Sequence, residues 1–299
     1  MPFSLTISVP VISSTNPIID YKGCALSAAR SKIAYLSYEE VKSLWTASAS
    51  GPDGPTASNK DTITSYIFEG VNSEPKYYHD ATSGVDAYSW LQGRTLHFVF
   101  RGTSSLTDAK IDIEQQRTNL LPDNTSILVH SGFCKQLLAI QTQMLMEIEQ
   151  LSSMIDAVHF SGHSLGGAVA TLAAGALSYA CKEMHDCRVI CHTVGSPRVG
   201  NKEFVSWWSS RVDESLRVQN FKDPIPLFPL NCLYTHIHGA LMINDDGTAK
   251  IIENDAPWYY RLMRLPYEIY CRNPFANHAC DLYIERLLKL ADWDVSAKI

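Results

Sequence analysis

The sequence predicts an α/β fold: a single domain with a mostly parallel central sheet flanked by helices. Three observations predict it. Strand-like and helix-like segments alternate through residues 157–221, a glycine-rich turn joins one of these strands to the next helix, and no linker-like segment interrupts the body of the chain. Strands that alternate with helices in this way form βαβ units, in which the strands run parallel.

Composition excludes several classes of protein. Hydrophobic residues make up 45% and charged residues 19% of the 299 positions, which is typical of a globular protein and not of a disordered, collagen-like or coiled-coil chain. The formal net charge is −6 and there is no long basic run, so nucleic acid is not an expected partner. The longest run of apolar and small residues, 166–177, is shorter than the roughly 20 residues that span a bilayer, so no transmembrane segment is expected.

The elements follow in chain order. Residues 1–61 are expected to form an N-terminal helical segment that packs on the core, helical over 22–47, and residues 62–299 are expected to form the α/β body of the same structural domain. The expected strands are Thr62–Phe68, Val85–Leu91, Thr95–Arg101, Ala157–Ser161, Arg188–Val194 and Leu216–Phe221, with a hairpin of Thr235–Ile243 and Thr248–Glu253 around Asp246-Gly247. The expected helices of the body are 131–152, Leu165–Ala180, Lys202–Arg211 and about Ala279–Ala291.

The segment Gly162-His163-Ser164-Leu165-Gly166 has the spacing of a Gly-x-Ser-x-Gly nucleophile elbow. It follows an expected strand and opens an expected helix, which is the context that such an elbow needs. Glycines two residues either side of the serine avoid a collision of a β-carbon with neighbouring backbone. Ser164 is therefore the candidate nucleophile, and the side chain of His163 is expected to point away from it.

A serine hydroxyl needs a base to accept its proton and an acid to orient that base. In this architecture the order along the chain is serine, acid, histidine. Asp223 follows the expected strand Leu216–Phe221, although Asp-Pro is also a common turn signal. Three histidines come later, of which His236 and His238 lie in a strand-like run, whereas His278 lies in a loop that can deliver its ring to the serine. His278 is the candidate base.

An ester hydrolase must also stabilise the oxyanion of a tetrahedral intermediate. The backbone N–H of Leu165, next to the nucleophile, is one candidate donor, and that of Thr103 is the other. Thr103 follows a strand in Phe100-Arg101-Gly102-Thr103, a segment that by itself also fits an ordinary strand end with a turn glycine.

Together these segments resemble the class 3 lipases, the fungal-lipase-like branch of the α/β-hydrolases, over about residues 62–290. The resemblance implies the α/β-hydrolase fold with a short lid, Ser164 as nucleophile, Asp223 as orienting acid, His278 as base, Thr103 and Leu165 as oxyanion donors, and no metal or organic cofactor. The matching segments are Phe100–Ser105, Val129–Phe133, Ser161–Ala168, Gly195–Asn201, Asn220–Pro226, Tyr234–His236, and His278 with Tyr283 five residues later.

The expected function is a serine carboxylic-ester hydrolase, first of all a lipase that acts on acylglycerols through an acyl-enzyme on Ser164. The alternatives are a phospholipase A1, a general or feruloyl-type esterase, and, from a different class, a non-catalytic hydrolase scaffold that binds a lipid or protein partner. The expected substrate is a lipid or other ester, for example at a membrane or droplet surface. In the lid, residues 106–113, Ala109 stands where fungal relatives often carry tryptophan, so weak interfacial activation is expected.

The N-terminus lacks the basic start and the unbroken apolar stretch of a signal peptide, which favours a cytosolic location but leaves another export route open. The eight cysteines are accordingly expected to be mostly reduced. No pair has CxxC spacing and no Cys/His set has zinc-ligand spacing, so no metal site is expected.

Overall fold

The structure is a computed structural model that describes residues 19–49, 62–71, 73–103, 116–121, 123–229, 233–237, 239–252, 275–297 and 299. The lid at 106–113, and with it the expectation about Ala109, lies outside the described residues, as do His238, Cys232 and Cys271.

The centre of the molecule is an eight-stranded sheet in the order β1-β2-β3-β6-β7-β8-β9-β10. The pairs from β3 to β9 are parallel, and the antiparallel pairs lie at the two edges. This confirms the α/β fold with a mostly parallel central sheet. The strands are β1 Lys76–Asp80, β2 Val85–Gln92, β3 Thr95–Phe100, β6 Ala157–His163, β7 Arg188–Val194, β8 Glu214–Asn220, β9 Ala240–Ile243 and β10 Ala249–Ile252, and a separate hairpin pairs β4 Arg117–Leu121 with β5 Asn124–His130.

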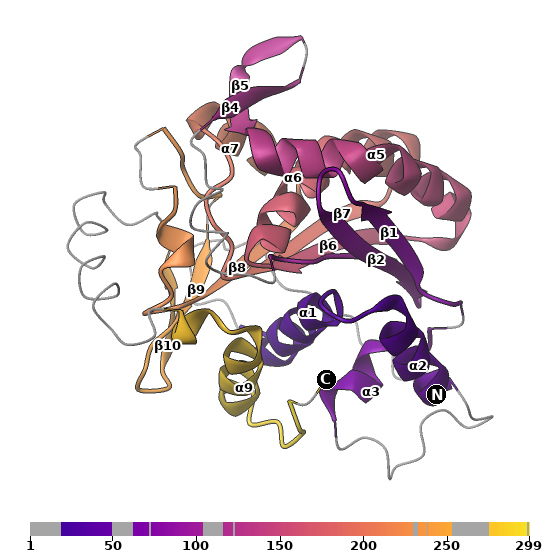
Figure 1. Cartoon of the computed structure of the whole chain (residues 1–299), viewed down its shortest axis with the longest axis vertical. Helices are drawn as coiled ribbons and strands as arrows, with labels where there is room; N and C mark the ends of the chain where they lie inside the picture. The colour runs from indigo at the N-terminus through magenta and orange to yellow at the C-terminus, as the bar shows by residue number, and fades with distance from the viewer. Residues whose placement is uncertain are drawn as a thin grey trace.

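Helices cover both faces of the sheet (Figure 1). On one face lie α5 Ser131–Leu151, α6 Leu165–Tyr179 and α7 Lys202–Ser209, and on the other lie α1 Tyr21–Ile33, α2 Tyr38–Ala49, α3 Ile63–Ile67 and α9 Cys280–Leu290. Strand side chains alternate between two cores, because successive residues of a strand point to opposite faces. In β3, Phe98 and Phe100 pack under α5 and α6, whereas Val99 packs under α1 and α9.

The part of the N-terminal segment that the structure describes, residues 19–49, forms two helices and not one. The chain turns between α1 and α2, and Ser37 begins the second helix with a capping box: its N–H and hydroxyl each donate to Glu40 Oε2 at 2.7 Å. The apolar periodicity over 22–47 spans both helices because both bury a face on the same core, which hides the break between them.

The expected strand Thr62–Phe68 is wrong, since Ile63–Ile67 forms the short helix α3. Short apolar runs are ambiguous between helix and strand, and tertiary contacts decide between them. Here Ile63 and Ile67, one helical turn apart, are fully buried, and Thr62 pairs only through an isolated bridge to Ser296. The expected strand Thr235–Ile243 is shorter, because only its last four residues join the sheet as β9.

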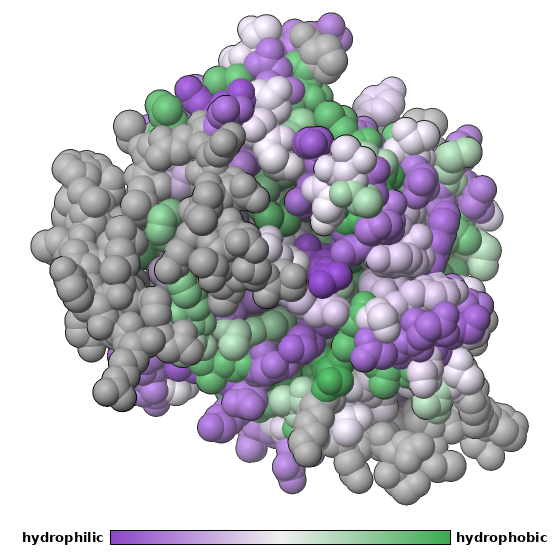
Figure 2. Space-filling view, viewed as in Figure 1, coloured by the Kyte–Doolittle hydropathy of each residue, from purple (hydrophilic) through white to green (hydrophobic). Residues whose placement is uncertain are grey.

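Six described cysteines are free, buried thiols: Cys24, Cys134, Cys181, Cys187, Cys191 and Cys280. Within the described ranges, no helix is both long and apolar enough to cross a bilayer, and no three acidic, histidine or cysteine side chains gather as metal ligands would. Hydrophilic and hydrophobic residues are intermixed on the face shown in Figure 2. The large exposed apolar side chains include Leu138, 59% exposed, and Tyr179, 68% exposed, on two different helices.

Candidate active site

Ser164 lies on a strained turn between β6 and α6. Its backbone φ is +59° and ψ is −131°, a backbone conformation that residues other than glycine rarely adopt. A β-carbon on Gly162 would collide with the backbone of Gly166, and one on Gly166 would collide with the backbone carbonyl of Phe100. The strand, turn and helix expected around the serine are therefore present, and the two glycines are needed because backbone passes within contact distance of each.

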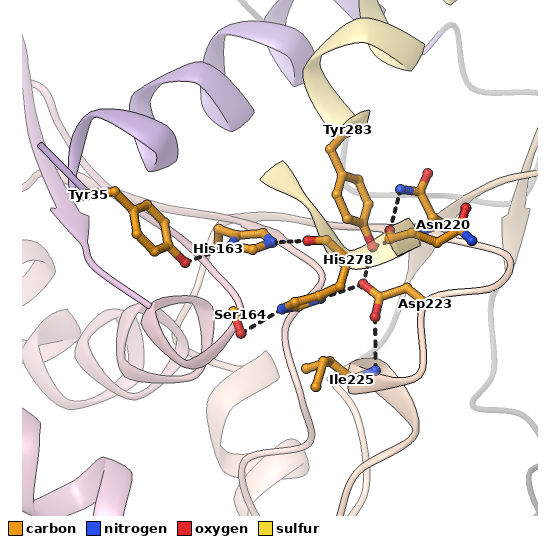
Figure 3. Close-up of polar contacts among 9 residues, drawn as sticks. Tyr35, His163, Ser164, Asn220, Asp223, Ile225, His278 and Tyr283 are labelled. Carbon is orange, nitrogen blue, oxygen red and sulfur yellow. Dashed lines mark hydrogen bonds and ion pairs between the residues drawn. The ribbon is translucent and has the colours of Figure 1, made fainter. Parts of the chain in front are cut away.

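Three side chains from distant parts of the chain meet at this turn (Figure 3). The Oγ atom of Ser164 is 2.7 Å from Nε2 of His278, and Nδ1 of His278 is 2.7 Å from Oδ2 of Asp223. Asp223 follows the end of β8, and His278 ends the short 3-10 helix Ala276–His278 that precedes α9. All three are at most 3% exposed. The structure thus brings together the three residues selected as nucleophile, acid and base.

The carboxylate of Asp223 is surrounded by hydrogen-bond donors. Its Oδ1 accepts the N–H of Ile225 at 2.9 Å, and its Oδ2 accepts the hydroxyl of Tyr283 at 2.6 Å as well as Nδ1–H of His278. These bonds offset the cost of burying a charged carboxylate. Because an ionised carboxylate can only accept, His278 carries its proton on Nδ1 and presents a lone pair on Nε2 to the serine hydroxyl. This is the tautomer that a general base needs.

Tyr283, on α9, connects the acid to the strand before it. Its hydroxyl donates to Asp223 and accepts the backbone N–H of Asn220 at 2.9 Å. Burial, together with the neighbouring Asp223, raises the pKa of Tyr283 well above its ordinary value, so the phenol remains a donor. The side chain of Asn220 in turn donates to the carbonyl of Asn277, next to His278, at 2.8 Å. Asn220, the last residue of β8, therefore hydrogen-bonds both to Tyr283, which contacts Asp223, and to the residue before His278.

Of the two candidate oxyanion donors, Leu165 follows the nucleophile directly, and Thr103 follows a glycine that lies against it. Leu165 is the first residue of α6, so its N–H has no partner within the helix and lies at the positive end of the helix dipole. Thr103 follows β3 in the segment Arg101-Gly102-Thr103. That segment runs against the nucleophile: a β-carbon on Gly102 would lie 2.7 Å from the carbonyl of His163 and 3.1 Å from Cβ of Ser164.

The other histidines near the site take different places. His236 is buried, and its Nε2 lies 2.6 Å from the carbonyl of Pro226, in the segment that follows Asp223. His163 bonds through Nδ1 to the hydroxyl of Tyr35 at 2.8 Å and through Nε2 to the carbonyl of His278 at 2.7 Å. Its ring also packs on that of His278, with centroids 4.5 Å apart. No local sequence pattern marks Tyr35 as part of the site, because it belongs to the N-terminal segment and arrives by tertiary packing.

Comparison with known proteins shows a similarity to one family over the middle of the chain. A family model described as lipase (class 3) matches residues 97–232. The lipase of Rhizomucor miehei is 31% identical over 140 residues, which are 46% of this chain and 38% of that protein. Over these residues the chain is similar to the class 3 lipases. The family match covers Thr103, Ser164, Leu165 and Asp223, whereas His278 lies beyond it and is placed by the structure alone.

Two further comparisons concern the fold and a second kind of relative. The solved structure of the Rhizomucor miehei triacylglyceride lipase superposes with a TM-score of 0.62 at 22% identity, covering 78% of this chain and 84% of that one, which confirms the α/β-hydrolase fold. Phospholipase A1-II 1 of Oryza sativa subsp. indica is 30% identical over 166 residues, 54% of this chain and 37% of that protein. The chain therefore spans less than half the length of the curated relatives that it matches.

Proposed function

We propose that this chain is a serine carboxylic-ester hydrolase, and first of all a lipase that cleaves acylglycerols through an acyl-enzyme on Ser164. The observation that carries the proposal is the continuous chain of hydrogen bonds from Ser164 through His278 to Asp223. The match to the class 3 lipase family model and the similarity to the Rhizomucor miehei lipase support it.

In the proposed acylation step, Oγ of Ser164 attacks the carbonyl carbon of the ester while Nε2 of His278 takes the hydroxyl proton. Asp223 stabilises the imidazolium that forms, through the bond to Nδ1. The backbone N–H groups of Thr103 and Leu165 stabilise the negative charge on the former carbonyl oxygen. When the intermediate collapses, the carbon–oxygen bond to the alcohol breaks, and His278 gives its proton to the leaving oxygen.

Deacylation repeats these steps with water as the nucleophile. His278 takes a proton from water, the hydroxide attacks the acyl carbon, and the bond to Oγ of Ser164 breaks as the proton returns to that oxygen. The free acid leaves and the serine is regenerated. Every proton transfer uses Nε2 of His278, which already lies within hydrogen-bond reach of Ser164. The mechanism requires no metal or organic cofactor.

The first test is the Ser164→Ala variant, assayed for hydrolysis of a short nitrophenyl ester and an acylglycerol. Without the nucleophile, turnover is expected to fall at least about 10⁴-fold. The fold is expected to remain, because alanine leaves the backbone of the turn unchanged. Ser206→Ala, an exposed serine of α7, is the matched control and is expected to keep full activity. A Ser164→Ala variant with turnover like that of the control would refute the proposal.

A second candidate, phospholipase A1, is favoured by one observation: a rice phospholipase A1-II 1 is 30% identical over a segment that includes 54% of this chain. Hydrolysis rates across tri-, di- and monoacylglycerols, phospholipids and short nitrophenyl esters distinguish the candidates. The lipase proposal expects acylglycerols to have the highest kcat/KM. Phospholipids at the top of that ranking would favour the second candidate, and absence of any hydrolysis would favour a non-catalytic scaffold.

A further inference from the structure

The residue beside the nucleophile, His163, makes contacts that the proposed mechanism does not use. Its ring is 4% exposed and both ring nitrogens have a partner. Nδ1 lies 2.8 Å from the hydroxyl of Tyr35, just beyond α1, and Nε2 lies 2.7 Å from the backbone carbonyl of His278 (Figure 3). The imidazole thus lies between the N-terminal segment and the residue proposed as general base.

The chemistry of the partners fixes the direction of each hydrogen bond. A backbone carbonyl can only accept, so Nε2 of His163 must carry a proton and donate it to His278. Burial and the adjacent His278 ring lower the pKa of His163 well below its usual value, so the ring is neutral and Nδ1 presents a lone pair. The hydroxyl of Tyr35 must therefore donate to Nδ1.

The hydroxyl of Tyr35 also lies close to the segment that precedes Thr103. The phenolic oxygen of Tyr35 packs against the backbone of Gly102. Gly102 is also the residue whose β-carbon would collide with that hydroxyl, so the glycine is needed for the approach. The two hydrogen bonds point one way: from Tyr35 to His163, and from His163 to the carbonyl of His278.

We propose that Tyr35 and His163 form a positioning pair that holds the imidazole of His278 in line with Ser164 and ties it to the oxyanion segment. This inference rests on the proposed esterase function. The backbone bond fixes the His278 residue, and the His163 ring, with centroids 4.5 Å apart and planes at 33°, limits the tilt of the catalytic ring. A neutral His163 also adds no positive charge beside the imidazolium that forms during the reaction.

The first test is Tyr35→Phe, which keeps the aromatic ring and removes only the hydroxyl. The variant leaves Nδ1 of His163 without its partner, so His163 can reorient. On a short soluble ester, kcat is expected to fall about 10- to 100-fold, because small displacements of catalytic groups cost about that much. KM is expected to change less than about threefold, because the variant removes alignment in the transition state and not substrate binding. Tyr179→Phe, 68% exposed, is the control and is expected to behave as wild type.

The second test compares two substitutions of His163, each of which places an amide at the position of only one of the two ring nitrogens. The amide of glutamine reaches the position of Nε2 and can still donate to the carbonyl of His278, whereas that of asparagine reaches only the position of Nδ1. His163→Gln is therefore expected to retain at least about tenfold more kcat than His163→Asn at similar thermal stability. A purely structural role would make activity follow stability in both variants.

The outcomes separate this inference from the proposed function. If Ser164→Ala is as active as wild type, the proposed function fails, and the pair has no base to position. If Ser164 is required but Tyr35→Phe keeps wild-type kcat, the inference alone is overturned. It is also overturned if His163→Asn equals or exceeds His163→Gln.

Discussion

At the scale of single residues, the site depends on how donors are arranged around Asp223. A buried carboxylate is costly unless it is hydrogen-bonded, and here the donors are the N–H of Ile225, the hydroxyl of Tyr283 and Nδ1–H of His278. They come from the turn itself, from α9 and from the loop before α9. The acid therefore keeps its orientation toward His278 only while all three elements are in place.

Tyr283→Phe tests this arrangement. The substitution removes one donor from Asp223 and the acceptor of the Asn220 N–H, and it changes little else in volume. The free energy of unfolding is expected to fall by about 1–3 kcal/mol, because a buried donor loses its partner. The kcat on a short ester is expected to fall about 3- to 30-fold as the acid loses its orientation, roughly 1–2 kcal/mol in the barrier. Denaturant unfolding and steady-state kinetics measure the two effects, and unchanged values for both would contradict this role.

At the scale of elements, α1 covers a row of buried histidines on three parallel strands. His97 on β3 lies with Nδ1 3.0 Å from Nδ1 of His159 on β6, and the ring of His159 meets that of His192 on β7 with centroids 4.8 Å apart. Ser27 of α1 bonds to Nδ1 of His192 at 3.0 Å. Burial lowers the pKa of His97 and of His159 well below the usual 6.5, so both rings are neutral in the folded protein.

This row predicts a loss of stability in acid. In the unfolded chain these rings gain a proton as the pH falls through about 6.5, whereas the folded state resists protonation, so the unfolded state binds more protons. The stability that neutral His159 provides is therefore fully present above pH 6.5 and is lost progressively below it. His159→Phe cannot titrate; it is expected to be less stable than wild type at pH 8, with a gap that narrows by about 1 kcal/mol per pH unit below 6.5. Urea unfolding at pH 8, 6.5 and 5 measures that gap, and parallel pH curves for the two proteins would refute the assignment.

The local patterns that predicted the site from sequence are those with a short-range cause. Gly162 and Gly166 flank Ser164 because the turn itself needs them. Chain order left three histidines after Asp223, and His278 was selected because it alone lies in a loop and not in a strand-like run. Tyr35 could not be predicted, because its contact with His163 spans 128 residues and depends on how α1 packs. The segment Ile63–Ile67 was wrongly predicted to be a strand. Its few apolar residues fit the spacing of a strand as well as that of a helix, and tertiary contacts decide between the two.

At the scale of the whole molecule, the N-terminal and C-terminal helices share one core. Ala25, Ala28 and Ala29 of α1 belong to the same buried cluster as Tyr283 and Leu287 of α9, together with side chains of the central sheet. Figure 1 shows α1 and α9 side by side under the sheet. The part of the site that α9 and Tyr35 position therefore depends on the N-terminal segment.

This packing predicts that residues 1–61 and 62–299 unfold together as one structural domain. Scanning calorimetry is expected to give one transition whose calorimetric and van't Hoff enthalpies agree to within about 10%. Hydrogen exchange is expected to give α1 the same maximal protection as α6, because both open only on global unfolding. Two resolved transitions, or an α1 that exchanges while α6 stays protected, would show that the N-terminal segment is a separate unit.

The central claim is that His278 activates Ser164 for attack on an acyl carbon. The most direct measurement is the rate at which a fluorophosphonate probe labels the protein, with the modified residue located by peptide mass spectrometry. Wild type is expected to carry the label on Ser164, Ser164→Ala to carry none, and His278→Ala to react at least about 100-fold more slowly. Label on a different residue, or His278→Ala labelling at the wild-type rate, would contradict the claim.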